Sequence, residues 1–382
     1  MKKRLVILGS TGSIGRSALD VVSRHRDRIE VVGLSSHSDI DLLLKQINEF
    51  NPAYAAVTDE KMYAKFRSTF SLPSVELLGP PDGLEKMAAL PETDIILNAI
   101  VGAAGLKASV SAVAAGKRLA LANKESMVIG GEMLNRLRRQ TGSEIIPVDS
   151  EHSAIWQALR SGKKEEVRKI ILTGSGGPFR ELPLDKFDSI TREQALAHPI
   201  WKMGEKITID SATMMNKGLE ILEAVQLFEL PAEKIDVVIH AQSIIHSMVE
   251  FIDSSVIAQM SYPDMRLPLS YALFYPERVE SQNGQMELAE IGSLTFGRPD
   301  FVKFPLLKAA YSVAGVGGTL PAVFNAANEV AVEAFLNDGI EFRRIPDIVI
   351  NSMERHNCIG NPSYQDIVDA DKEGRRVARE LI

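Results

Sequence analysis

The sequence predicts an α/β protein in which an N-terminal parallel sheet is followed by a central α+β domain and a C-terminal helical domain. Residues 1–149 alternate short apolar runs with stretches long enough for a crossover helix. This alternation is typical of a parallel sheet covered by helices on both faces. After residue 150 several apolar runs follow one another closely, which indicates a sheet that is at least partly antiparallel.

Each element of the first two parts is predicted from its own run of residues. Six strands are expected in the first part, at KRLVILG, IEVVGLS, AYAAV, TDIILNAI, RLALA and EIIPV. The second part is expected to contain strands among VRKIILTGS, ITIDS, KIDVVIHAQ, IHSMVEFI and SVIAQM, with helices at 151–161 and about 212–230. Apolar residues at helical spacing predict the second helix, and Asp210 or Ser211 is its expected N-cap.

The rest of the chain reads as a connector followed by helices. YPERVESQNGQMELAEIGSLTFGRP is polar and irregular, whereas PLLKAAYSVAG, PAVFNAANEVAVEAFLNDG and SYQDIVDADKEGRRVARELI follow helical patterns. We therefore expect domains at 1–149 and 150–275, a linker at 276–299 and a helical domain at 300–382.

The composition is typical of a globular enzyme in a reducing compartment. Of the 382 residues 45% are hydrophobic and 24% charged, and the formal net charge of -7 argues against a nucleic-acid partner. The single cysteine, Cys358, excludes an intramolecular disulfide. The apolar runs near the N-terminus and at 95–106 are too short or too interrupted for a signal-peptide core or a membrane span. We expect a cytoplasmic protein.

A glycine-rich turn follows the first expected strand. In GSTGSIGRSALDVV, Gly9, Gly12 and Gly15 lead into a helix. Glycines let the backbone approach a pyrophosphate, and the N-terminus of the helix supplies free N–H groups. The spacing is GxxGxxG and not the usual GxGxxG, so its place between strand and helix carries the prediction of a Rossmann-type dinucleotide site. Glycines that serve only a tight turn are the alternative.

The end of the second strand favours NADPH. NAD enzymes place an Asp or Glu there for the ribose 2′-hydroxyl, whereas this chain has donors that suit a 2′-phosphate, with Asp39 a few residues further on. These donors are Ser36, His37 and Ser38, preceded by Ser35. A polar loop without a role in cofactor binding is the alternative.

Carboxylates cluster after the last strand of the first domain. In IIPVDSEHSAIWQ, Asp149 and Glu151 are separated by one residue, so both can point the same way from a strand end. With Glu220 they form a set of oxygen ligands that suits Mg²⁺ or Mn²⁺. An acid/base pair or a helix cap would use the same residues. His152 is expected to support the site and not to bind the metal.

Three polar stretches indicate where a substrate binds. In ANKES, Lys124 follows a strand and can hold a substrate hydroxyl, although a solvated helix start would look the same. GSGG at 174–177 offers backbone N–H groups to an anion, or forms a plain turn. In DSATMMNKGLE, Asn216, Lys217 and Glu220 share one face of the predicted helix, where a simple ion pair is the alternative.

A loop rich in proline and glycine carries one of the two tryptophans. In HPIWKMG, Trp201 and Met203 are expected to form a lid that keeps water away from a reacting site. The alternative is a packed loop with Trp201 in the core.

Together these motifs resemble one family. GSTGSIG, ANKES, VDSEH, GSGGPFR, HPIWKMG, DSATMMNKGLE and FNAANE, in this order, are similar to the motifs of 1-deoxy-D-xylulose 5-phosphate reductoisomerase of the non-mevalonate isoprenoid pathway. The resemblance covers nearly the whole chain. It implies an NADPH-binding domain, a central catalytic domain that forms a homodimer, and a helical C-terminal domain. The implied reaction rearranges 1-deoxy-D-xylulose 5-phosphate to an aldehyde, which hydride transfer reduces to 2-C-methyl-D-erythritol 4-phosphate.

The resemblance also implies a role for each matching residue. The metal ligands are Asp149, Glu151 and Glu220. The substrate residues are Lys124, Ser150, Glu151, Ser175, His198, Ser211, Asn216, Lys217 and Glu220, of which Ser175, Ser211, Asn216 and Lys217 grip the phosphate and nearby hydroxyls. The NADPH residues are Thr11, Gly12, Ser13, Ile14, Asn123, Glu125 and Gly204. His152 and His246 match histidines near the family's site, and the predicted catalytic set is Lys124, Glu151, His198, His152 and His246. Where the family has a short tract with Gly and Asn, this chain has SSHSD.

Three other kinds of protein share parts of this pattern. A semialdehyde dehydrogenase needs a nucleophilic cysteine, and Cys358 has no activating motif nearby. A homoserine-type dehydrogenase has no need for three carboxylates. A dinucleotide-sensing module without catalysis leaves the same carboxylates unexplained.

Overall fold

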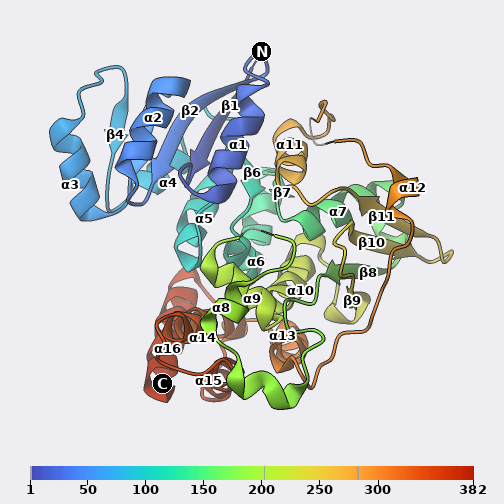
Figure 1. Cartoon of the computed structure of the whole chain (residues 1–382). Coiled ribbons are helices and arrows are strands. Elements are labelled where there is room, and N and C mark those ends of the chain that lie inside the picture. The colour runs from blue at the N-terminus through green and yellow to red at the C-terminus, as the bar shows by residue number, and fades with distance from the viewer. Residues whose placement is uncertain (1, 202, 282–283) are drawn as a thin grey trace. The chain divides into compact units, whose positions relative to one another are not determined.

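The computed structural model describes residues 2–201, 203–281 and 284–382, and it consists of two compact units (Figure 1). The first unit is made of Met1–Ser126, Leu134–Ser153 and Asp264–Gln282, and the second of Met127–Met133, Ala154–Pro263 and Asn283–Ile382. Both units therefore combine stretches that are far apart in the sequence. The division into four segments at 149, 275 and 299 stays a prediction.

The first unit is built on a seven-stranded parallel sheet in the order β4-β3-β2-β1-β5-β6-β7. Its strands are β1 (Lys3–Leu8), β2 (Ile29–Ser36), β3 (Tyr54–Val57), β4 (Glu76–Leu78), β5 (Ile95–Asn98), β6 (Arg118–Leu121) and β7 (Ile145–Pro147). The predicted parallel sheet is confirmed. The sequence does not predict the edge strand β4, because its three residues are too few to show an alternating pattern.

The order of the strands creates a binding crevice. From β1 to β4 each new strand is added on one side of β1, and from β5 onward on the other side. The strand order therefore reverses between β1 and β5, although all strands are parallel. In open α/β sheets a ligand binds outside the carboxyl ends of the strands at such a reversal. Because Leu5 to Leu8 of β1 are fully buried, the strand is continuously apolar and the polar residues begin only where it ends.

Helices pack on this sheet. They are α1 (Ser13–Ser23), α2 (Ile40–Phe50), α3 (Glu60–Thr69), α4 (Gly83–Ala88), α5 (Leu106–Ala114) and α11 (Arg266–Phe274), with part of α6 (Lys124–Thr141) and the start of α7 (Ser150–Ala158). The helix α11 packs against α1 although more than 240 residues separate them, and Arg266 binds Asp20 across this contact. A segment that the sequence assigned to the end of the second domain therefore belongs to the first unit.

The second unit contains a four-stranded mixed sheet in the order β11-β10-β8-β9. Its strands are β8 (Val167–Gly174), β9 (Ile235–Ile239), β10 (Ile245–Phe251) and β11 (Val256–Met260). The strand β10 is antiparallel to β8 and β11, whereas β8 and β9 are parallel. The predicted sheet, at least partly antiparallel, is confirmed.

The prediction of a strand at ITIDS is wrong. Residues 207–211 lie within α9 (Glu205–Ala212), where the Thr208 hydroxyl donates to Gly204 O one turn earlier. The β-branched residues at 207–209 suggested a strand, but Thr208, Ile209 and Asp210 are buried one after another, without the alternation of a strand that has one exposed face. Consequently Asp210 and Ser211 do not cap the next helix. Its N-cap is Met214, whose backbone is in the left-handed region (φ 59°).

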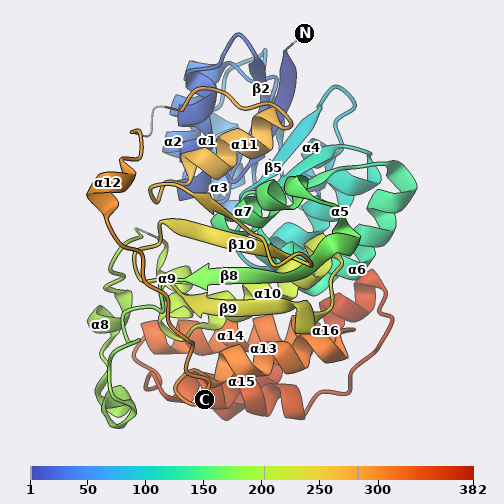
Figure 2. The same cartoon turned by 90° about the vertical axis from the view of Figure 1, so that its right-hand side faces the viewer.

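Besides α9, the second unit contains α10 (Met215–Phe228), which contacts α9 and α13, and several further helices. They are α8 (Arg192–Leu196), α12 (Leu288–Ile291), α13 (Pro305–Val316), α14 (Leu320–Leu336), α15 (Arg344–Glu354) and α16 (Tyr364–Leu381). Figure 2 shows α13 to α16 grouped together, as the sequence predicts for the C-terminal part. The central helix α14 contacts α9, α13, α15 and α16, which explains why nearly all of its residues are buried.

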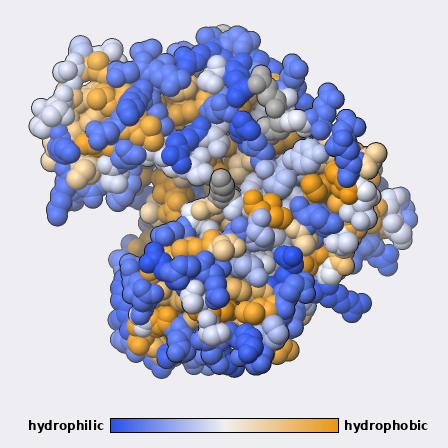
Figure 3. All heavy atoms as spheres, in the orientation of Figure 1, coloured by the Kyte–Doolittle hydropathy of each residue, from blue (hydrophilic) through white to orange (hydrophobic). Residues whose placement is uncertain are grey.

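Hydrophilic residues dominate the face of the molecule drawn in Figure 3, with smaller apolar areas between them. Among the described residues, no helix has the length and apolar character needed to cross a membrane.

Candidate functional site

The turn after β1 can be built only with glycine at two positions. Gly9 has φ 84°, and a Cβ there would lie 2.8 Å from Ala99 O at the end of β5. A Cβ on Gly15 would lie 2.4 Å from Gly9 O. The turn therefore packs against its own helix and against the neighbouring strand end, and it leads into α1 with Gly12 as N-cap. These are the features that let a pyrophosphate approach a backbone.

Asn123 holds the segment that follows β5, the strand next to β1. Its amide nitrogen donates to Ile100 O and Gly102 O at 2.8 Å each, and its Oδ1 accepts the Ser126 N–H at 3.0 Å as the N-cap of α6. The side chains of Asn123 and Glu125 are buried and bonded to each other at 3.1 Å. Both predicted cofactor residues thus lie at the carboxyl edge of the sheet, where the fold places a ligand.

Of the polar residues at the end of β2 and just after it, some are buried and others are exposed. The hydroxyl of Ser36 is buried, accepts the Asp39 N–H at 3.1 Å and bonds to Thr11 Oγ1 at 2.9 Å. Asp39 caps α2 by accepting the Leu42 N–H, so its carboxylate is stabilised at that helix N-terminus. His37 is exposed, and its Nδ1 bonds to Thr58 Oγ1 at 2.8 Å.

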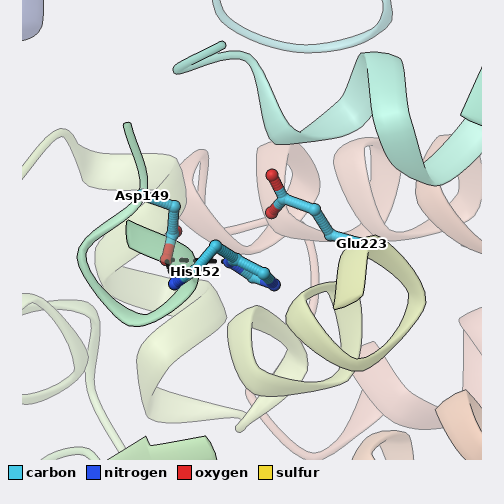
Figure 4. Close-up of side chains that lie close together, drawn as sticks. All are labelled: Asp149, His152 and Glu223. Carbon is cyan, nitrogen blue, oxygen red and sulfur yellow. Dashed lines mark hydrogen bonds and ion pairs between the residues drawn. The ribbon is translucent and has the colours of Figure 1, made fainter. Parts of the chain in front are cut away.

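The sequence predicts that the carboxylates of VDSEH point from a strand end. They lie instead at the start of a helix. Asp149 follows β7 and caps α7, since its Oδ1 accepts the Glu151 N–H at 3.1 Å. The same oxygen accepts the Nδ1–H of His152 at 3.1 Å (Figure 4). Carboxylate oxygens of Asp149 and Glu151 lie within 4.8 Å of each other, close enough for one cation to bind both.

Lys124 compensates the charge of Asp149. Its ammonium lies 2.9 Å from Asp149 Oδ2, and the exposed fractions of the two side chains are only 9% and 12%. Burial alone would raise the pKa of Asp149, but the charges and hydrogen bonds of Lys124 and His152 outweigh it and hold this pKa well below its ordinary value. Asp149 is therefore an anion at neutral pH, as a metal ligand must be.

In the second unit, the predicted face of α10 is confirmed. Asn216 Nδ2 donates to Glu220 Oε1 at 2.6 Å, and the Lys217 ammonium contacts Glu220 Oε2. Lys217 also reaches the carbonyl of Thr173 at the end of β8, and Glu220 is fully buried. A buried amine and carboxylate joined by a half-buried amide are more than a surface ion pair, because burying charges is costly.

The loop 174–177 folds against these residues because Gly174 and Gly177 have no side chains. A Cβ on Gly174 would lie 2.8 Å from Lys217 Cε, and one on Gly177, at φ 68°, would lie 2.5 Å from Ser211 O. The loop therefore brings Ser175 together with Lys217 and Ser211 in one part of the unit. Backbone N–H groups, two hydroxyls and an ammonium form a site suited to a phosphate.

His198 connects this site with the predicted lid. Its Nδ1 accepts the N–H groups of Ile200 at 3.2 Å and Trp201 at 2.9 Å, so the ring is neutral and carries its proton on Nε2. That nitrogen lies 3.2 Å from Ser175 Oγ and donates to it. Trp201 in turn packs against the ring of His246, with centroids 6.2 Å apart, and His246 Nε2 donates to Ser261 O.

Three family models match the chain one after another. Their descriptions are 1-deoxy-D-xylulose 5-phosphate reductoisomerase for residues 5–131, the C-terminal domain of the same enzyme for 145–228, and DXP reductoisomerase C-terminal domain for 260–377. The chain belongs to the 1-deoxy-D-xylulose 5-phosphate reductoisomerase family. It is thus an NADP-dependent oxidoreductase.

Curated and solved members of the reductoisomerase family match the chain over its full length. The chain is 48% identical to the enzyme of Halothermothrix orenii and 50% identical to that of Chlorobium phaeovibrioides, and each match covers 100% of this chain and 99% of the relative. A structure from Zymomonas mobilis, in complex with NADPH, superposes with a TM-score of 0.93 at 40% identity, covering 100% and 99% of the two chains. Another, with NADPH, fosmidomycin and magnesium, gives 0.92 at 37% identity, covering 99% and 98%.

Each unit carries part of the set that the reductoisomerase motifs predict. The first unit holds Thr11, Gly12, Ser13, Ile14, Ser36, His37, Ser38, Asn123, Lys124, Glu125, Asp149, Ser150, Glu151 and His152. The second holds Ser175, His198, Trp201, Met203, Gly204, Ser211, Asn216, Lys217, Glu220 and His246. Lys202, inside the predicted lid, lies outside the described residues. Gly204 is the N-cap of α9, and a Cβ there would meet nothing within 4 Å, so space does not require glycine at this position.

Sequence reasoning missed several buried polar residues of the second unit. Glu223, also drawn in Figure 4, is fully buried on α10 one turn after Glu220. Its position three residues from Glu220 on the same face was the available signal. Asp210 and Asn328 are buried and bonded to each other across 118 residues, and no local pattern announces such a pair.

The loop that carries Trp201 is expected to respond to acid through His198. Burial lowers the pKa of His198, so between that value and the ordinary one of about 6.5 the unfolded chain binds more protons than the folded one. The stability that neutral His198 contributes is therefore complete above pH 6.5 and is lost as the pH falls below it. A Trp156→Phe background leaves Trp201 as the only tryptophan, and its emission should change below pH 6.5. The same change in a His198→Asn variant would contradict this.

Proposed function

We propose that the chain converts 1-deoxy-D-xylulose 5-phosphate into 2-C-methyl-D-erythritol 4-phosphate with NADPH and Mg²⁺ or Mn²⁺, as a homodimer in the cytoplasm. The carboxylate pair Asp149 and Glu151, directly after the last strand of a dinucleotide-binding sheet, supports this most strongly. A dehydrogenase without a metal does not need two neighbouring, half-buried carboxylates there. The free thiol of the only cysteine, Cys358, suits a reducing compartment.

The metal in this proposal is held by Asp149, Glu151 and Glu220. Their oxygens are hard ligands of the kind that Mg²⁺ and Mn²⁺ prefer. When bound, such a cation polarises the substrate carbonyl and stabilises charge that develops on oxygen. His152 orients Asp149 through its Nδ1–H, as the partners of metal ligands commonly do. Lys124 balances the charge of Asp149 and can hold a substrate hydroxyl.

The substrate phosphate in this proposal binds at the loop 174–177. Its ligands are Ser175, Ser211, Asn216 and Lys217, and the Nε2–H of His198 donates a hydrogen bond to the Ser175 hydroxyl. Holding the phosphate away from the reacting carbons lets binding energy orient them. Trp201 and Met203 cover the reacting atoms, with His246 packed against Trp201, so that water is kept from the aldehyde before its reduction.

The cofactor in this proposal binds to the turn of Thr11, Gly12, Ser13 and Ile14, with Asn123, Glu125 and Gly204 also in contact. Ser36, His37 and Ser38 receive the 2′-phosphate. Of these, His37 is exposed with one nitrogen held by Thr58, which fixes the ring. A fixed ring is a better anion ligand than a mobile one, since less conformational freedom is lost on binding.

Replacing His37 by Ala is expected to weaken NADPH binding about fivefold, equivalent to the ~1 kcal/mol of a single hydrogen bond. NADH lacks the 2′-phosphate, so its dissociation constant should stay unchanged. Calorimetric titration of both cofactors measures this. Equal losses for NADH and NADPH would place His37 outside the 2′-phosphate site.

A face of the second sheet supports the proposed dimer. Ile171, Met248 and Ala258 stand side by side on β8, β10 and β11, on the face opposite the buried Ile170 and Val249. This row is only partly covered, and Ala258 is exposed. Light scattering of the protein and of a Met248→Glu variant tests the assignment: a dimer that Met248→Glu converts to a monomer supports it, and a monomeric native protein refutes it.

The direct test is oxidation of NADPH by the purified chain with 1-deoxy-D-xylulose 5-phosphate. We expect oxidation that stops when the metal is chelated and returns with Mg²⁺ or Mn²⁺. Folded protein that binds NADPH but oxidises none of it under either condition would refute the proposal. The other dehydrogenase classes would then have to be considered again.

A further inference from the structure

The motif FNAANE has no role in the metal, phosphate or cofactor sets. It occupies residues 324–329 in the middle of α14, and both of its asparagines, Asn325 and Asn328, are fully buried. Amides are costly to bury unless they form specific hydrogen bonds. The partners of these two side chains therefore indicate why polar residues stand in an otherwise apolar helix.

Asn328 binds the carboxylate that precedes Ser211. Its Nδ2 donates to Asp210 Oδ1 at 2.8 Å, and the ammonium of Lys206 lies 2.8 Å from Asp210 Oδ2. Asp210 is only 1% exposed, so these contacts replace the water that a carboxylate would otherwise bind. Lys206 is on the same helix as Asp210, whereas Asn328 lies on α14 and fixes the end of α9 to that helix.

The end of α9 is also one wall of the phosphate site. Ser211 O would lie 2.5 Å from a Cβ on Gly177. It accepts the N–H of Met214, whose left-handed conformation turns the chain into α10. A small rotation of the last turn of α9 would therefore move Ser211 against the loop 174–177. Because Asp210 is the neighbour of Ser211, the bond from Asn328 controls this rotation.

The second asparagine serves a different purpose. Asn325 Nδ2 donates to Glu329 Oε1 at 3.0 Å, and Glu329 forms an ion pair with Arg375 on α16. These contacts join α14 to α16 and do not reach α9. The motif thus contains Asn325 and Glu329, which stabilise the packing of α14 on α16. Asn328, by contrast, binds the helix that carries Ser211.

We propose that Asn328 is a positioning residue, which holds Ser211 in place for the substrate phosphate by fixing Asp210. The assignment rests on the proposed function, because Ser211 is a phosphate ligand only in that proposal. Asn328 itself touches neither the substrate nor the cofactor.

The test compares Asn328→Ala with Glu329→Gln. Loss of the bond from Asn328 is expected to raise the KM for 1-deoxy-D-xylulose 5-phosphate and the inhibition constant of inorganic phosphate about tenfold, the effect of one hydrogen bond to a charged group. The dissociation constant of NADPH and kcat should change little. Glu329→Gln should lower the melting temperature without raising either phosphate constant. Equal constants for native protein and Asn328→Ala would overturn the proposal.

Two further variants separate positioning from a general loss of stability. Asn328→Asp places a second carboxylate against Asp210, and its KM defect should shrink as the pH falls, because one shared proton restores the donor. The double variant Asp210→Asn with Asn328→Asp exchanges the two groups and should recover the native KM. A defect in Asn328→Asp that is independent of pH, together with a double variant no better than the single ones, would refute the proposal even if Asn328→Ala does not fold.

The proposed function and the role of Asn328 can be refuted separately. If the native protein neither oxidises NADPH with this substrate nor binds inorganic phosphate, the proposed function fails. If the native protein does both and the Asn328 variants match it, only the role of Asn328 fails.

Discussion

A Glu220→Gln variant is expected to lose metal-dependent turnover while it still binds NADPH. Glu220 is fully buried, and it receives both the Asn216 amide and the Lys217 ammonium. Glutamine keeps the size of the side chain but removes the charge that a divalent ligand set needs. It also leaves the buried ammonium of Lys217 without its counter-charge.

The expected loss in kcat/KM is on the order of 10²- to 10³-fold. Removing one partner of a buried charge pair costs ~3–5 kcal/mol, and each ~1.4 kcal/mol in the barrier is a factor of ten. Part of the cost should also appear as a lower melting temperature. Raising the Mg²⁺ concentration should recover little activity, because the missing oxygen anion cannot be replaced by mass action alone.

Glu229→Gln is the matched control. Glu229 ends the same helix, its side chain is 38% exposed, and it approaches Lys164 only at 3.8 Å. A surface pair of this kind contributes little, so activity should stay near the native level. A Glu220→Gln variant with native activity in the presence of metal would exclude Glu220 as a ligand.

A Gly15→Ala variant is expected to lose NADPH binding by about a hundredfold or more. The added methyl group would lie 2.4 Å from Gly9 O and 2.5 Å from Ser10 Cα, and neither is the end of a flexible side chain. The turn after β1 must then move away from α1, which destabilises the unit by roughly 1–3 kcal/mol. In the proposed function this turn holds the pyrophosphate, so the cofactor should lose its backbone contacts at the same time.

Gly315→Ala controls for the loss of a helical glycine. Gly315 lies in α13, and a Cβ there would meet nothing within 4 Å. Alanine should stabilise that helix by up to ~1 kcal/mol and leave NADPH binding unchanged. Titration of both variants with NADPH, followed by fluorescence, measures the difference. Native affinity in Gly15→Ala would show that the turn can relax without losing its ligand.

Local periodicity predicted much of the architecture correctly. The turn between β1 and α1 and the shared face of Asn216, Lys217 and Glu220 follow from contacts within a few residues, which backbone geometry fixes. The same reasoning failed at 207–211, where an alternating pattern lies in the helix α9. The residues that packing buries there, Thr208, Ile209 and Asp210, follow one another along the chain and do not alternate with exposed ones as in a strand.

By itself the sequence determined the parallel sheet, the glycine turn, the helical C-terminal part and the residue types of the candidate site. The tertiary structure alone decided that Asp149 caps α7 while it binds Lys124, that Gly177 makes room for Ser211 O, and that Asn328 reaches Asp210. The physical reason is the range of the interactions. Hydrogen bonds within a turn or helix recur at fixed spacings, whereas contacts between distant segments depend on how apolar faces pack and leave no period in the chain.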